Sequence, residues 1–185
     1  ADVGVQVGLG FVVGTGSGDA RIVAERNSSN DGQTDLVFIT DIAAGGSLEA
    51  MRIVGNRTGI NNADPKASLH VKNIGIDTQN SVVNSSDESV IATFSTTDFR
   101  STKFMIQMED VGNNNHLVSE LLCVYEPNTQ TAHAIVYGVV FTGNEKGVIF
   151  NVDVSSSTVR LKATCDATST TRRFTVATMS LAHTA

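Results

Sequence analysis

The sequence predicts an all-β protein, and three observations lead to that fold class. Ser, Thr, Asn and Val are abundant, and the 185 residues include 16 Gly, two Pro and no Trp, a composition typical of strands joined by turns. Segments in which apolar and polar residues alternate recur along the chain, as in strands that are buried on one face. Ala, Leu, Lys and Glu are nowhere dense enough for a long amphipathic helix. We therefore expect strands and turns throughout.

Residues 1–80 are predicted to form a β-rich, oligomerising stem or collar. Its strand candidates are residues 20–26, 35–40, 49–54 and 68–71, of which 49–54 also fits a short helix. Large apolar residues are too sparse here to enclose a core, and an isolated pair of short strands is marginal in water. Open sheet edges also invite aggregation unless something covers them. We therefore expect copies of the chain to cover these strands, and residues 73–89 to form the junction to the next part.

Residues 81–185 are predicted to form an antiparallel β-sandwich of about seven strands, because short alternating segments are regularly separated by turn clusters. In residues 102–110, for example, Phe104, Ile106 and Met108 share one face. Two segments, 117–125 and 132–141, are apolar on both faces, as central or doubly covered strands are. The expected strands are residues 89–95, 102–110, 117–125, 132–141, 147–154, 158–165 and 173–181.

The glycine-rich segment 8–18 is similar in spacing to a dinucleotide-binding loop but does not fit one. Val13 stands at the third glycine position of the G-x-G-x-x-G pattern, and no helical pattern follows to bind an anion. We expect these glycines to be structural. The two cysteines, Cys123 and Cys165, lie in strand-like apolar segments, so we expect small buried side chains. A disulfide between them remains open if their strands are neighbours.

Several classes of partner and chemistry are disfavoured. The net charge of −6 is spread along the chain, which offers no basic patch for nucleic acid. No apolar run approaches the roughly 20 residues that span a bilayer, so membrane insertion is not expected. The four histidines have no metal-ligand spacing, and no triad, carboxylate pair or nucleophile elbow is recognisable. We expect a protein that is not an enzyme and has no cofactor.

Residues 20–71 resemble a segment that is widespread in phage tail fibres and related virion fibres. The family form has a "RI-ER" strand, a "TDL-F-T" strand and an "ERMRI" strand, followed by "GNVGIGT-NP--KLHV". Ala50 replaces the usual Arg, and "NRTGINNADP" lacks one Gly of the usual run. The matching residues are Arg21, Ile22, Glu25, Arg26, Thr34, Asp35, Leu36, Phe38, Thr40, Glu49, Met51, Arg52, Ile53, Gly55, Asn56, Gly59, Ile60, Pro65, Leu69, His70 and Val71.

This resemblance implies an elongated, intertwined homotrimer, in which the bend after Ile60 turns the chain around a shared axis. Residues 95–181 also resemble a β-sandwich module of structural proteins from cyanophage-like viruses. Together they predict a virion structural protein, a tail-fibre or fibre-like subunit on the particle surface. Its stem would trimerise, its sandwich would be a displayed head, and its partners would be copies of itself and other virion proteins.

Two alternatives remain open. One is a capsid or tail decoration protein, and the other is a receptor- or glycan-binding module that contacts a host surface glycan or protein. Loops on a rigid scaffold commonly carry recognition, so two loops of the predicted head are the candidate binding tips. Their candidate ligand-binding residues are Asn113, Asn114, Asn115, His116, Asn128 and Gln130.

Overall fold

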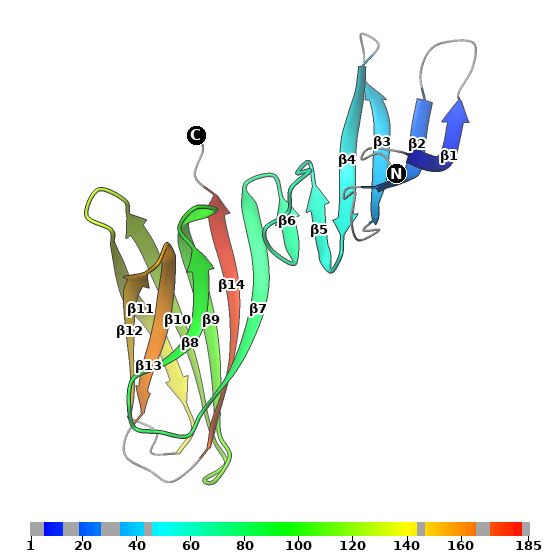
Figure 1. Ribbon diagram of the computed structural model, residues 1–185. Helices are drawn as coiled ribbons and strands as arrows, with labels where there is room; N and C mark the ends of the chain where they lie inside the picture. The colour runs from blue at the N-terminus through cyan, green and yellow to red at the C-terminus, as the bar shows by residue number, and fades with distance from the viewer. Residues whose placement is uncertain are drawn as a thin grey trace. The chain divides into compact units, whose positions relative to one another are not determined.

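The computed structural model in Figure 1 describes residues 6–12, 19–26, 34–42, 46–143, 147–165 and 171–182. All regular secondary structure in these ranges is β-strand. The predicted all-β fold class is therefore confirmed. The chain divides into two compact units, Ala1–Gly75 and Ile76–Ala185, which we call unit 1 and unit 2.

Unit 1 is built on one sheet with the strand order β1-β2-β3-β4-β5-β6. Consecutive strands pair antiparallel from β1 to β5, whereas β5 and β6 pair parallel. The segment 49–54 is strand rather than helix. The strands are β1 (Gln6–Val12), β2 (Asp19–Arg26), β3 (Thr34–Ile42), β4 (Gly46–Val54), β5 (Arg57–Ile60) and β6 (Leu69–Val71).

The sequence reasoning missed β1 and β5. In β1 a glycine stands at alternate positions, Gly8 and Gly10, and glycine weakens a strand prediction because it has no side chain to pack. Residues 8–12 of the glycine-rich segment lie in this strand, whereas 13–18 lie outside the described residues. A Cβ atom on Gly8 would lie 2.4 Å from the Ile22 carbonyl oxygen and 2.5 Å from Val23 Cγ1. This glycine therefore allows β1 to approach β2 closely.

The turn-rich bend between β5 and β6 closes on itself within one chain. The Asn62 side-chain oxygen accepts from the Asp64 N–H at 2.9 Å, and the Lys66 N–H donates to His70 Nδ1 at 3.1 Å. His70 is buried. A Cβ atom on Gly59 would lie 2.0 Å from the Asn62 carbonyl oxygen, so only glycine fits there. The bend thus brings the chain back to the start of β5, so that β6 runs parallel to β5. Hydrogen bonds within the same chain hold the bend in this shape.

Unit 2 is a two-layer sandwich. Its larger sheet has the order β7-β14-β9-β10-β11, and its smaller sheet has the order β12-β13-β8. All seven strands expected between residues 89 and 181 are present (Figure 1). The strands are β7 (Ile74–Val83), β8 (Ser89–Ser95), β9 (Phe99–Asp110), β10 (Asn115–Glu126), β11 (Thr131–Phe141), β12 (Val148–Ser155), β13 (Thr158–Cys165) and β14 (Arg172–Ala182).

Strand β7 changes the expected organisation of the chain. Residues 73–89 were expected to form a junction and residue 80 to end the first part, but β7 occupies 74–83 and the second unit begins at Ile76. The segment has few large apolar residues, so its composition is that of a linker. It holds its place partly through polar contacts: the Gln79 side chain donates to the Thr93 carbonyl oxygen at 2.7 Å and accepts from the Thr93 N–H at 2.9 Å.

The core of unit 2 lies between its sheets. Phe104, Ile106 and Met108 of β9 are fully buried, as their alternation predicted. The rings of Phe94 and Phe104 meet across the two sheets with their centroids 6.2 Å apart. The buried apolar residues of this core are Ile91, Ala92, Phe94, Phe99, Phe104, Ile106, Met108, Leu117, Leu121, Cys123, Val159, Leu161, Ala163, Cys165, Phe174 and Val176.

Both cysteines are buried and they are not joined by a disulfide, which confirms the expected burial and settles the question of a disulfide left open above. Removal from water raises the pKa of the Cys123 thiol to about 11. Residues 117–125 and 132–141 were expected to form central or doubly covered strands, which is confirmed for β10, a central strand between β9 and β11, and wrong for β11. β10 is buried on one face only, and β11 ends its sheet with ten of its eleven residues exposed.

Candidate functional site: two uncovered apolar sheet faces

One face of the sheet in unit 1 is apolar across five strands. Cross-strand pairing places Leu9, Ile22, Phe38, Met51 and Ile60 in a single row from β1 to β5, and directly paired residues lie on the same face. We call this surface the stem face. Its apolar residues are Val7, Leu9, Phe11, Ala20, Ile22, Ala24, Leu36, Phe38, Leu48, Met51, Ile53 and Ile60.

Within the described residues, no second layer covers the stem face. Leu9 is 59% exposed, and every residue of β1 is exposed. The buried hydrophobic side chains of unit 1 are Val23, Val37 and Ala67. Val23 and Val37 pair with each other and lie on the opposite face of the sheet. The stem face is therefore a broad apolar surface that is left in contact with solvent in one chain.

The opposite face carries an ionic cluster centred on Arg52. Its guanidinium lies 2.6 Å from Asp35, 2.7 Å from Glu25 and 2.6 Å from Glu49. These four residues come from β2, β3 and β4, and all four are positions of the fibre-segment resemblance. Arg52 pairs across the strands with Gly59 and Val37, and its side chain is only 13% exposed.

The cluster fixes the register of three strands through one side chain. The hydrogen bonds that Arg52 donates to Glu49, followed by those to Asp35 and Glu25, raise the pKa of Arg52 above its ordinary value and outweigh the partial burial that lowers it. Because a shift of β3 or β4 by one residue would turn its side chains to the other face, the cluster also determines which face is apolar.

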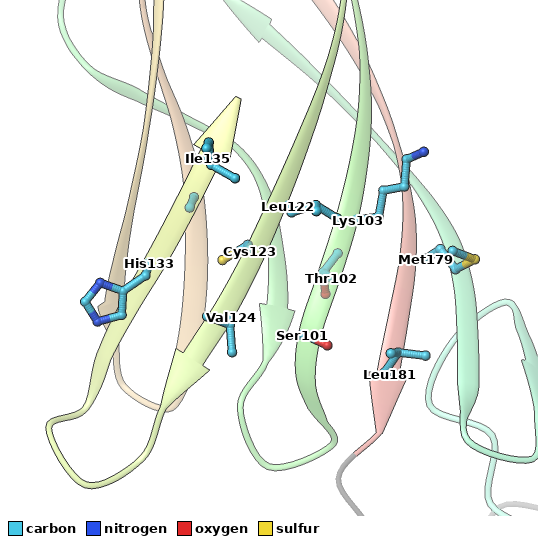
Figure 2. Close-up of a pocket in the computed structure, with 11 residues that line it drawn as sticks. Ser101, Thr102, Lys103, Leu122, Cys123, Val124, His133, Ile135, Met179 and Leu181 are labelled. Atoms are coloured by element: carbon cyan, nitrogen blue, oxygen red, sulfur yellow. The ribbon is translucent and has the colours of Figure 1, made fainter. Parts of the chain in front are cut away.

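A second uncovered apolar face lies on the larger sheet of unit 2, on the side away from the core. Cross-strand pairing aligns Met179, Lys103, Leu122 and Ile135 in one row over β14, β9, β10 and β11. This row borders a shallow depression of about 530 Å³. Figure 2 shows these side chains with Leu181, Val124 and Ser101, which form the next row. We call this surface the head face.

A neutralised pair of charges lies in the middle of the head face. Lys103 Nζ is 2.9 Å from Glu120 and 5.7 Å from the centre of the Tyr137 ring. The contact with Tyr137, followed by that with Glu120, raises the pKa of Lys103, and contacts with Tyr137 and then Lys103 lower the pKa of Glu120. Both groups are therefore charged at neutral pH, and their charges offset each other.

The loop residues expected to bind a ligand lie at the two ends of β10. Asn113 and Asn114 are in the turn before this strand, Asn115 and His116 begin it, and Asn128 and Gln130 are in the turn after it. A strand of this length spans roughly 36 Å at about 3.3 Å per residue, so the structure does not bring the two sets together. Asn114 and Gln130 have positive φ angles of 52° and 54°.

Two of these residues also take part in turn hydrogen bonds. Asn113 Nδ2 donates to Asp110 at 2.9 Å, and the Asn128 N–H donates to Glu126 at 2.9 Å. The described ranges contain no group of three His, Cys, Asp or Glu residues arranged to hold a metal ion. Nor do they contain a helix that is long and apolar enough to cross a membrane.

The chain has a structural likeness to a phage tailspike protein. No family model matches the chain, and no curated protein matches it. The crystal structure of the tailspike protein of Acinetobacter baumannii phage AM24 is similar over 60% of this chain and 27% of the tailspike chain, with 13% sequence identity and a TM-score of 0.43. The matched region therefore spans about a quarter of the tailspike.

Proposed function

We propose that this chain is a structural subunit of a virus particle, a fibre-like protein that assembles as a homotrimer through its stem face. The observation that carries the proposal is the uncovered apolar row from Leu9 to Ile60, on a sheet that buries very little within one chain. Unit 2 is then the displayed head. The resemblance of residues 20–71 to virion fibre segments supports both the setting and the number of three chains.

The energetics favour association through this surface. A single-layer sheet needs a second layer to bury its apolar face, and copies of the same chain supply one with matching character. Burying roughly 500 Å² per chain at about 25 cal/mol per Å² contributes on the order of 12 kcal/mol, which is comparable to the total stability of an ordinary domain. Part of this gain offsets the entropy lost on association.

The ionic cluster supports the same assignment of faces. Arg52 and its three carboxylates keep the opposite face polar, so the sheet has one side suited to water and one suited to another apolar surface. The four residues of the cluster are among those that match the fibre segment, so the resemblance and the proposed assembly share these positions.

The mass of the chain in solution tests the proposal. We expect a three-chain species for the natural sequence and a single-chain species for Leu9→Asp, because Leu9 is already exposed in one chain and its replacement removes little packing within that chain. Val90→Asp in unit 2, another exposed apolar position, is the matched control and keeps the mass. A natural sequence that sediments as a folded single chain at all concentrations contradicts the proposal. Antibody labelling of particles then tests the location.

A further inference from the structure

The last strand of the larger sheet in unit 2, β11, is an edge strand without the usual protection. It contains no Lys, Arg, Asp, Glu or Pro, the residues with which natural edge strands discourage pairing with other chains. It ends the strand order of its sheet, so its outer edge has no strand partner in the described part of the chain. An edge of this kind is open to another strand.

Both faces of β11 are apolar and exposed. Ile135 and Val140, on the head face, are 64% and 73% exposed, and Val136 and Val139 on the inner face are also exposed. The neighbouring strand β10 differs, because its inner residues are buried. The strand pairing skips Tyr137, so a bulge places this ring beside Lys103. A strand that is apolar on both faces is normally covered on both.

The opposite side of the sandwich shows how this protein closes an edge. Strand β8 ends the smaller sheet, yet the Gln79 side-chain amide makes two hydrogen bonds with the backbone of Thr93, at 2.7 and 2.9 Å. This amide takes the backbone hydrogen-bonding groups on the edge of β8 that another strand would need for pairing. The chain therefore blocks the edge of β8, while the edge of β11 stays open.

We propose that β11 and the head face form a second interface between copies of this chain. The inference rests on the proposed function, since subunits already gathered by their stem faces meet here at a high effective concentration. The partner is a second copy of the chain, and two further observations, on area and on charge, support that choice.

The first is the area available. About half of each large apolar side chain on the head face is exposed, which amounts to roughly 700 Å² of apolar surface, close to the ~800 Å² per partner of a standard interface. These side chains are Met105, Val118, Leu122, Val124, Ile135, Tyr137, Val140, Met179 and Leu181.

The second observation is charge. The chain has a net charge of −6, yet the Lys103–Glu120 pair is neutral as a whole, so two head faces meet without like-charge repulsion. Glu109 pairs across the strands with Arg173, 3.6 Å away, on one side and with His116 on the other, and these residues give the surface a polar end. An apolar centre with a polar rim is the usual arrangement of a protein–protein interface, and it offers no basic patch to a nucleic acid.

Hydrogen exchange in the full-length chain tests the proposal. We expect the amides of residues 131–141 in the assembled natural protein to exchange at least about tenfold more slowly than in Ile135→Lys/Val140→Lys. The double variant places charge on the strand without removing buried side chains. Val90→Lys, which changes an exposed apolar residue of β8 in the smaller sheet, is the control and leaves exchange in 131–141 unchanged.

A photo-crosslink provides a measurement that does not depend on the lysine variants folding. A benzophenone side chain in place of Ile135, in a mixture of isotope-labelled and unlabelled chains, should join residues of two different chains. Crosslinks confined to one chain, or fast exchange of 131–141 in an assembled protein, overturn this second interface and leave the stem assembly standing. A natural protein that is a single chain throughout overturns both.

Discussion

Arg52 and Asp35 are 2.6 Å apart on the polar face of unit 1, and the Asp35 side chain is only 4% exposed. A carboxylate in such a position is stable only while its cation is present, because removing one partner leaves a desolvated charge uncompensated. Since Glu25 and Glu49 bind the same guanidinium, this one side chain neutralises part of the charge of three neighbouring strands. Arg52 is therefore the residue to which all three carboxylates of the ionic cluster bind.

Replacing Arg52 by Met should therefore destabilise unit 1 by about 2–4 kcal/mol. The measurement is thermal unfolding at one fixed chain concentration, because oligomerisation makes the melting temperature depend on concentration. Arg160→Met is the control: its partner Asp153 is at 2.5 Å, but both side chains are about one third exposed, so a much smaller loss is expected. Equal losses in the two variants would contradict the role given to Arg52.

Asp153 predicts a specific acid response. The hydrogen bonds from Arg160 and then from Lys162 lower its pKa from 3.8 to about 2. Because the folded-state pKa is lower than that of the unfolded chain, the ion pair stabilises the protein fully above about pH 4 and loses this contribution as the pH falls towards 2. The difference in melting temperature between the natural protein and Asp153→Asn should be small and constant from neutral pH to about pH 5, and should vanish at about pH 2. A difference that grows in acid would rule this out.

Gly59 and Gly10 provide a matched pair of substitutions within unit 1. Gly59→Ala places a Cβ atom 2.0 Å from the Asn62 carbonyl oxygen, whereas the nearest atom to a Cβ on Gly10 is Arg21 Cγ at 3.9 Å, an ordinary contact. We expect Gly59→Ala to lower the free energy of unfolding by about 2 kcal/mol or more, and Gly10→Ala to leave it nearly unchanged. Denaturant titration gives both values. A neutral Gly59→Ala would show that the bend is not held as described.

The two buried thiols should be inert in the folded protein. Cys123 and Cys165 lie in the core of unit 2, and the pKa of Cys123 is raised to about 11, so very little of the reactive thiolate is present at neutral pH. Maleimide labelling should be slow under native conditions and complete for both cysteines in denaturant. Rapid labelling of one cysteine without unfolding would indicate that the core opens locally.

Strands with clear alternation could be predicted from the sequence, and strands that depend on contacts far along the chain could not. Spacing alone predicts the burial of Phe104, Ile106 and Met108, and the same kind of alternation predicts the strands of unit 2 after residue 88. β7 carries polar residues that become useful only when Thr93 lies beside Gln79, and no local pattern reveals that contact. β1 was missed because glycines occupy the positions on its polar face.

The candidate site was only partly visible in the sequence. Residues 132–141 are apolar on both sides, which predicts a central or covered strand, but whether a cover comes from the same chain or from another is not a local property. The network of Lys103, Glu120 and Tyr137 depends on pairing between β9, β10 and a bulge in β11, so no spacing rule could have identified it. The convergence of Glu25, Asp35 and Glu49 on Arg52 gives a physical reason for four positions of the fibre-segment pattern.

The sequential strand order of unit 1 bears on how the protein is made. Because β1 to β6 each pair with the next strand in the chain, their contacts close short loops, which is the least demanding route to a sheet. The larger sheet of unit 2 instead places β7 next to β14, so it cannot be completed until the last strand has left the ribosome. We therefore expect the stem face to form while the head is still being translated, when nascent chains on one messenger RNA are close neighbours. Assembly would then begin during synthesis, before any finished subunit is released.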